Sequence, residues 1–176
     1  MKENLSFIIR DIICFVVIIA VVAVLVNVVF INGFVPTASM EPTLHTKGLF
    51  LGDRLAYRHA DPERYDVIVF HAPDTGELYV KRVIGLPGEH LYIQDNKVYV
   101  NGDETDSEFV NGTMDFPDMD YGIIPEDSYF MMGDNRNNSQ DSRFWVNTFL
   151  KKDEILGKVW FTYWPEFKKV SEVRWI

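Results

Sequence analysis

The feature that most constrains the fold is a long apolar stretch at residues 12–31, which reads IICFVVIIAVVAVLVNVVFI. It holds no charged residue, and Asn27 is its one polar group. A helix of this length is about 30 Å long, which matches the hydrocarbon core of a bilayer. We therefore predict a single transmembrane anchor at 12–31, with a short N-terminal segment at 1–11 before it and one domain at 32–176 after it.

Two other interpretations of this stretch stay open at the level of sequence. A buried core helix rarely continues for this length without polar residues. A cleavable signal peptide has an apolar run of only about 7–15 residues and an A-x-A-like exit, and neither feature is present. Lys2 and Arg10 favour a cytoplasmic N-terminus, although Glu3 and Asp11 weaken the positive-inside signal. The domain would then lie on the extracytoplasmic face.

The composition of the rest of the chain is that of one folded domain. The 176-residue sequence is 47% apolar and 14% aromatic, enough for a hydrophobic core. The net charge of −9 argues against nucleic acid as a partner, because phosphates select basic surfaces. Much of this charge lies in residues 101–121, which hold seven acids and no Lys or Arg. Cys14 is the only cysteine, so no intrachain disulfide is possible.

The domain has the pattern of short strands separated by turn residues. The expected strands are Gly48–Gly52, Asp66–Phe70, Glu77–Ile84, His90–Ile93, Lys97–Val100, Ser128–Met132 and Leu156–Trp164. Asn101-Gly102 is a strong turn signal at the end of a hairpin. Helical periodicity is nearly absent after residue 31, apart from single turns near Asp61–Arg64 and Lys151–Ile155. We predict a mainly β, antiparallel domain, either a sandwich or a partly open barrel, with 101–121 as an exposed acidic excursion.

No metal or cofactor is expected. The carboxylates of Asp118 and Asp120 alternate as in a calcium loop, but the glycine is misplaced and no Glu closes the loop. The four histidines lack zinc-like spacing and have no cysteine beside them in the domain.

A candidate nucleophile, Ser39, lies in the stretch 36–44, which reads PTASMEPTL. This serine is flanked by small residues, and it follows the apolar stretch by only eight residues, at most about 26–29 Å of extended chain. We therefore expect it to lie close to the bilayer surface. Pro, Ser and Thr are also ordinary loop residues, so the stretch needs a catalytic base elsewhere to support this interpretation.

Lys81 is the candidate base, because no histidine has a recognisable triad setting. In the strand around it, Lys81 shares one face with Tyr79 and Val83, while Arg82 points to the other face. Apolar neighbours would desolvate the ammonium and lower its pKa, as a proton-accepting amine requires. The alternative is an edge-strand lysine whose ammonium extends into water.

A polar stretch at residues 133–143, GDNRNNSQDSR, is the third candidate part of the site. It is followed by Phe144-Trp145, which should pack and draw the polar residues inward. Buried polar groups must bond one another. We therefore expect Ser139 to hold the lysine nitrogen and Asp141 to pair with Arg143.

These stretches together resemble the bacterial type I signal peptidases, the Ser–Lys leader peptidases of the S26 family. The matching pieces, in order, are P-T-A-S-M-E-P-T-L at 36–44, G-D-R-L at 52–55, Y-V-K-R-V-I-G-L-P-G-E at 79–89 and G-D-N-R-N-N-S-Q-D-S-R at 133–143. The first piece alone is moderately specific, and all four in order after an anchor are highly specific. The fold implied is a transmembrane helix followed by the antiparallel β domain of the signal peptidases.

The resemblance implies roles for individual residues. Ser39 would be the nucleophile, Lys81 the general base and Ser139 the group that orients the lysine. The oxyanion hole would be formed by the Ser39 backbone N–H and the Thr37 hydroxyl, at a position where many relatives have Ser. Two further residues, Asp141 and Arg143, would brace the site. Asn137 replaces the usual Asp, which removes the charge for a local ion pair.

The resemblance also implies the reaction. The chain would be a membrane-anchored serine endopeptidase, monomeric and facing the extracytoplasmic side, that cleaves signal peptides after an A-x-A arrangement. Two shallow apolar pockets would select the small residues, with Val35, Pro36, Met40, Leu44 and Tyr79 as their lining. The alternatives are a Ser–Lys peptidase with a narrow client such as a pilin, and a membrane-tethered assembly factor or chaperone. The presence of both Ser39 and Lys81 weighs against an assembly factor.

Overall fold

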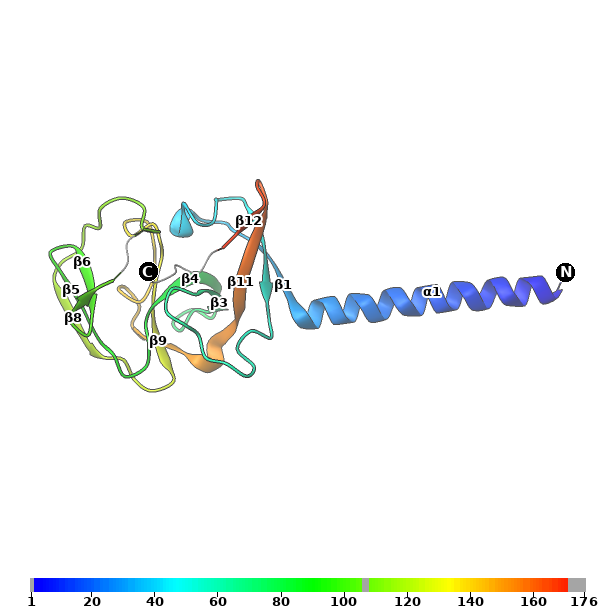
Figure 1. Ribbon diagram of the computed structural model, residues 1–176, viewed down its shortest axis with the longest axis horizontal. Helices are drawn as coiled ribbons and strands as arrows, with labels where there is room; N and C mark the ends of the chain where they lie inside the picture. Colours follow the sequence, from blue (N-terminus) through cyan, green and yellow to red (C-terminus); the bar gives the residue numbers. More distant parts are fainter. Residues whose placement is uncertain (1, 106–107, 171–176) are drawn as a thin grey trace.

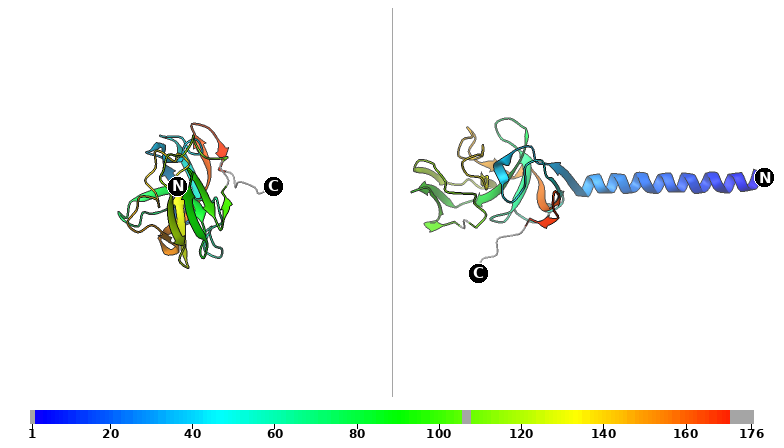
Figure 2. Two further views of the ribbon diagram at one scale, coloured as in Figure 1. Left: turned by 90° about the vertical axis from the view of Figure 1, so that its left-hand side faces the viewer. Right: turned by 90° about the horizontal axis from the view of Figure 1, so that it is seen from above.

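The computed structural model describes residues 2–105 and 108–170. They form a β domain and one long helix that projects from it (Figure 1). Helix α1 runs from Lys2 to Val29, and the right-hand view of Figure 2 shows it projecting clear of the domain. Its segment Phe7–Val29 is long and apolar enough to cross a membrane, and none of that span is buried against the protein. The last two residues of the predicted anchor belong to strand β1 instead, because they pair with β2.

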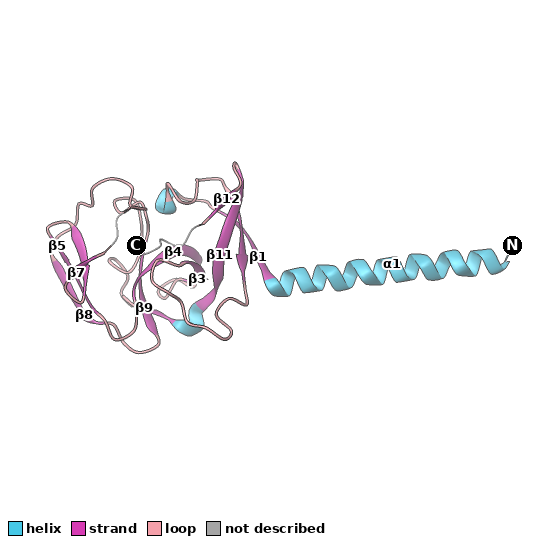
Figure 3. Cartoon of the chain, viewed as in Figure 1, coloured by secondary structure: helices cyan, strands magenta, loops and turns pink. Residues whose placement is uncertain are grey.

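The main sheet has eight antiparallel strands, in the order β1-β2-β11-β3-β4-β9-β10, with β12 paired to β11 (Figure 3). β1 begins at Phe30, immediately after α1, so no linker separates the helix from the sheet. The strands are β1 (Phe30–Phe34), β2 (Leu49–Asp53), β3 (Val67–His71), β4 (Leu78–Gly85), β9 (Ser128–Met132), β10 (Leu150–Lys151), β11 (Ile155–Trp164) and β12 (Lys168–Lys169). The predicted mainly β, antiparallel fold is confirmed.

A second, four-stranded sheet has the order β7-β6-β5-β8. Its strands are β5 (His90–Gln94), β6 (Lys97–Val100), β7 (Asp103–Glu104) and β8 (Met119–Ile123). Asp95 and Asn96 join β5 to β6 with φ of 50° and 62°, the left-handed conformation that two-residue hairpins require. Of the helical turns expected, the one near residue 153 forms as the 3-10 turn Lys152–Glu154. Asp61–Arg64 is not helical, and the Asp66 N–H closes a single turn there by donating to the Glu63 carbonyl oxygen at 3.1 Å.

The acidic excursion is only partly exposed, which corrects the sequence-based expectation. Its described residues include β7 and the start of β8, and its side chains Phe109 and Met114 are buried. Both belong to the core cluster that fills the space between the two sheets, with Leu91 and Phe130. Phe109 and Met114 lie between acidic residues in the sequence, and their burial holds this segment against the domain.

Two further core clusters support the region around Ser39. The first packs Met40 and Leu44 against Phe50 of β2, directly behind the nucleophile segment. The other packs β3, β4 and β9 together through residues such as Phe70 and Met131. Burial of Val35 before Ser39, and of Met40 and Leu44 after it, therefore anchors both ends of the loop that carries Ser39.

Candidate active site

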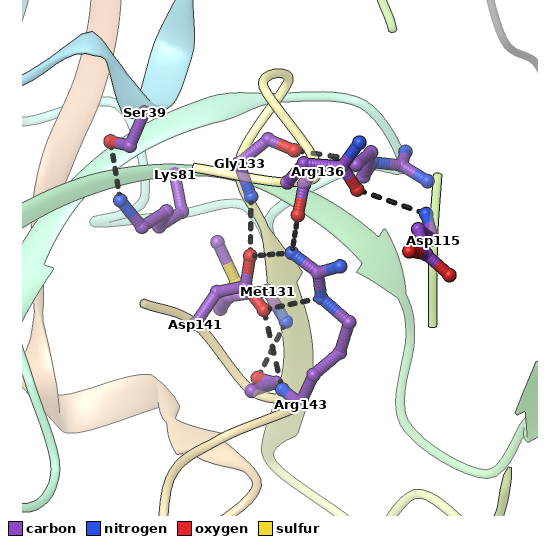
Figure 4. A network of polar contacts seen from close by, with 10 residues as sticks. Ser39, Lys81, Asp115, Met131, Gly133, Arg136, Asp141 and Arg143 are labelled. Atoms are coloured by element: carbon purple, nitrogen blue, oxygen red, sulfur yellow. Dashed lines mark hydrogen bonds and ion pairs between the residues drawn. The ribbon is translucent and has the colours of Figure 1, made fainter. Parts of the chain in front are cut away.

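Ser39 and Lys81 are brought together although they are 42 residues apart in the chain. Ser39 lies in the short 3-10 helix Ala38–Met40, and Lys81 lies in the middle of β4. Their Oγ and Nζ atoms are 2.6 Å apart, as Figure 4 shows. Only 7% of Ser39 and 4% of Lys81 is exposed. The sequence-based alternative, a lysine whose ammonium extends into water, is therefore wrong.

The surroundings of Lys81 favour its neutral form. Burial lowers the pKa of this amine to about 8, although the nearby carboxylates of Asp141 and Asp134 act in the opposite direction. The Tyr79 ring lies 5.3 Å from the Lys81 Nζ atom and supplies part of the apolar surface. A lysine with this pKa is partly unprotonated in mildly alkaline solution and can accept a proton.

The loop that follows β9 wraps behind Lys81 and is held by a buried ion pair. Asp141 accepts two hydrogen bonds from the Arg143 guanidinium, both 2.8 Å long, so the pairing expected from the sequence is confirmed. The Asp141 carboxylate also accepts the Gly133 N–H at 3.0 Å (Figure 4). In turn, Arg143 donates to the Arg136 carbonyl oxygen at 2.7 Å. These bonds close residues 133–143 into a rigid loop.

Ser139 does not make the expected bond to Lys81. Its side chain is buried, but within the described residues its hydroxyl has no hydrogen-bond partner. The Lys81 ammonium is turned toward Ser39 instead. Ser139 does line the same cavity as Lys81, so it is near the base without contacting it through a hydrogen bond.

A second buried ion pair was missed at the sequence level. Arg82 donates to both carboxylate oxygens of Asp134, at 2.8 Å and 2.6 Å, and both side chains are almost fully buried. The Thr43 hydroxyl also donates to Asp134. The strand pattern predicts only that Arg82 points away from Lys81. Arg82 and Asp134 lie in the stretches 79–89 and 133–143 quoted above, but only the fold shows that they meet.

This ion pair connects three segments that build the site. Arg82 belongs to the strand of Lys81, and Thr43 belongs to the loop that carries Ser39. Next to Asp134, Asn135 donates its backbone N–H to the Ser39 carbonyl oxygen at 3.1 Å and its side-chain amide to the Ala38 carbonyl oxygen at 3.2 Å. The position of Ser39 therefore depends directly on the loop after β9.

Two residues that differ from the usual pattern of the resembled family also have defined contacts. The Thr37 hydroxyl donates to the Ser39 Oγ atom at 3.3 Å, so it lies beside the candidate nucleophile. Asn137 accepts the Asp115 N–H at 2.9 Å and donates to the Thr113 carbonyl oxygen at 2.8 Å. A carboxylate could not donate that second bond, so the asparagine suits this chain.

A groove of about 710 Å³ runs past the Ser39–Lys81 pair. Of the five residues expected to line it, Val35, Pro36, Met40 and Tyr79 do so. Leu44 does not, because its side chain is fully buried in the core behind Met40. Further lining residues, which the sequence did not indicate, are Ile31, Phe34, Leu78, Val80, Gln140 and Phe144.

Among the residues that the structure describes, the walls of this groove include two strand edges without a pairing partner. β1 is the terminal strand of the main sheet, paired only with β2. β4 pairs with β3 along Leu78–Arg82, but its other edge pairs with β9 only from Arg82 onward. The edge at Leu78–Lys81 is thus open to the groove, and backbone groups there are available to an extended peptide.

Comparison with known proteins identifies close similarity over most of the chain. The family described as "Signal peptidase, peptidase S26" matches residues 8–164. Signal peptidase I of Bacillus caldolyticus is 39% identical over 166 residues, covering 87% of this chain and 89% of that protein. A probable signal peptidase I-2 of Synechocystis sp. is 36% identical over 140 residues, and the match covers 75% of this chain and 62% of that relative.

A solved structure gives the same indication. The crystal structure of a signal peptidase I from Enterococcus faecalis aligns with a TM-score of 0.50 and 32% identity. The alignment covers 56% of this chain and 96% of that chain.

Proposed function

As a member of the signal peptidase family, peptidase S26, this chain is a serine endopeptidase, and we propose that it removes signal peptides from exported preproteins with Ser39 as nucleophile and Lys81 as general base. The observation that carries this proposal is the 2.6 Å contact between the two buried side chains. The N-terminal helix fits membrane anchoring, as expected for this family.

The chemistry begins with proton transfer from Ser39 to the neutral Lys81 amine. The Ser39 Oγ atom attacks the scissile carbonyl carbon and forms an acyl-enzyme, and the protonated Lys81 donates to the departing amine. A water molecule, deprotonated by the same amine, then releases the acyl group. The oxyanion would be stabilised by the Ser39 backbone N–H and by the Thr37 hydroxyl, which lies beside the Ser39 Oγ atom.

The groove favours an extended peptide with small side chains. A substrate strand can add its backbone hydrogen bonds to the open edges of β1 and of β4 at Leu78–Lys81. Side chains on one face of that strand would point into the apolar floor formed by Val35 and Met40. This floor is shallow because both residues are packed against the core, which favours alanine-like residues of the A-x-A pattern.

The bilayer positions the groove at the height of the cleavage site. Because β1 begins directly after α1, the domain must lie against the membrane surface. Several exposed aromatic side chains of β11 and the turn after it, namely Trp160, Tyr163, Trp164 and Phe167, suit the lipid interface. We place the domain on the extracytoplasmic side, where translocated preproteins emerge, and we propose that it acts as a monomer.

A cleavage assay on the full-length protein tests the proposal. A preprotein with an A-x-A site should be cut, and Ser39→Ala and Lys81→Ala should each abolish the cut. Lys97→Ala, at an exposed lysine of the second sheet, should cleave like the parent. The rate should rise with pH through about 8, as Lys81 loses its proton. Normal cleavage by either dyad variant, or a flat profile from pH 6 to 9, would refute the assignment.

A panel of preproteins assayed in the same way determines the client range. Cleavage of many unrelated signal peptides would support general processing. Cleavage of one prepilin-like substrate alone would favour a dedicated peptidase instead.

A further inference from the structure

The acidic excursion reaches the back of the active site through two of its aromatic side chains, Phe109 and Phe116. The Phe109 ring covers the guanidinium of Arg82, with 4.1 Å between the Arg82 Cζ atom and the ring centroid. The Phe116 ring covers the guanidinium of Arg143 at 5.3 Å. Each arginine is one half of a buried ion pair in the walls of the site. The excursion therefore touches both pairs.

Backbone and amide bonds fix the excursion in this place. The Asn111 N–H donates to the Asp134 carbonyl oxygen at 2.9 Å, two residues from Phe109. The Asn137 side chain binds the excursion at Thr113 and Asp115. Phe109 is itself buried against the Tyr65 ring at 5.2 Å. The aromatic contacts thus belong to an ordered surface that is held from several sides.

The two ion pairs hold the loop after β9 in place beside Ser39 and Lys81. Asp134 joins the strand of the base to the nucleophile loop, and Asp141 holds the backbone of Gly133. Ion pairs of this kind are strong only while water is kept away from them. Phe109 and Phe116 are the side chains of the excursion that cover these arginines.

We propose that Phe109 and Phe116 are positioning residues for the Ser39–Lys81 pair, acting by covering the Arg82–Asp134 and Arg143–Asp141 ion pairs. This inference rests on the proposed function. Neither ring touches the reacting atoms. Their effect passes through the ion pairs to the loop that contacts the Ser39 carbonyl oxygen.

The proposal predicts a specific kinetic change in Phe109→Leu, which keeps an apolar side chain but loses the ring. The kcat should fall about tenfold, because small shifts of catalytic groups have large effects on rate. The KM should stay unchanged, because the ring does not line the groove. Phe109→Tyr, which keeps the ring, should retain kcat. Phe116→Leu, at a less buried position, should lower kcat in the same way and to a smaller extent.

The pH profile supplies a second measurement that simple destabilisation would not change. Asp134 and Asp141 raise the pKa of Lys81, whereas its burial and the nearby Arg143 lower it. Phe109 lies on the Arg82 side of β4, opposite Lys81, so its loss would admit water to Asp134 and leave the burial of Lys81 intact. The charge of Asp134 would be screened, and the acid limb of the profile should move to lower pH.

The matched control is Val98→Ala, in the same core cluster but on β6, away from both ion pairs. It should lower the melting temperature without changing kcat or the pH profile. An equal loss of kcat in Phe109→Leu and Val98→Ala would overturn the proposal, and so would unchanged kinetics in both phenylalanine variants. Neither result would affect the dyad assignment, which Ser39→Ala and Lys81→Ala test separately.

Discussion

Burial of Lys81, the proposed catalytic base, is a source of instability that can be measured. The pKa of its amine falls from 10.5 to about 8 on folding. Each unit of pKa difference corresponds to about 1.4 kcal/mol, so the folded state is disfavoured by about 3 kcal/mol when the lysine must be protonated. Lys81→Met keeps the length and removes the charge. We expect it to abolish cleavage and to raise the free energy of unfolding by up to about 3 kcal/mol at pH 7.

The sign of the pH dependence follows from the lowered pKa. Below about pH 8, Lys81 is protonated in both the folded and the unfolded chain, and the full cost is present. Between pH 8 and 10.5 only the unfolded chain binds the proton, so the parent becomes more stable relative to Lys81→Met as pH rises. The stability difference between the two proteins should therefore vanish near pH 10.5.

Urea titrations of the full-length protein in micelles measure this difference, with tryptophan fluorescence as the signal. Titrations at pH 7, 9 and 10.5 sample the pH range below and above the folded-state pKa of Lys81. Lys97→Met is the control, because it removes one exposed ammonium from the second sheet. The reasoning is refuted if Lys81→Met is less stable than the parent at pH 7, or if the difference does not change with pH.

Two further predictions concern the residues around the Ser39–Lys81 pair. Arg82→Met leaves the buried Asp134 carboxylate without its ion pair and should destabilise the domain by about 3–5 kcal/mol in urea titrations. The double variant Arg82→Met/Asp134→Leu should recover much of that loss, and no recovery would contradict this account. Gly133→Ala would bring a methyl group within 2.5 Å of the Ser39 carbonyl oxygen. The kcat should therefore fall by about a hundredfold in the preprotein assay. A variant with parental kcat would contradict this prediction, because it would show that the loop can move aside.

Local patterns in the sequence were sufficient for most of the fold. The apolar stretch predicts α1 because membrane insertion depends on length and hydrophobicity alone. The ends of the seven predicted strands lie within about two residues of the observed ones, because turn residues such as Asp95 and Asn96 have backbone requirements of their own. The strands β1, β7, β8, β10 and β12 were not predicted. The order of strands in the sheets was not predictable in this way, because it depends on pairing between distant segments.

The candidate site shows the same division. Motifs in the sequence single out Ser39, Lys81 and the Asp141–Arg143 pair, and the fold brings Ser39 to Lys81 and Asp141 to Arg143. The wrong expectation for Leu44 arose because nearness in sequence to Ser39 does not decide which way a side chain points. The bond expected from Ser139 to Lys81 is absent because the lysine nitrogen is directed to Ser39.

The sequence by itself determined the anchor, the strand-rich domain and the residue types of the dyad, because each of these is encoded over a few neighbouring residues. Only the tertiary structure decided what surrounds the dyad. Strand pairing brings Arg82 to Asp134, 52 residues away, and packing brings Phe109 onto Arg82. The chemistry of Lys81 depends on this packing, because a lysine becomes a base at moderate pH only when the fold removes it from water.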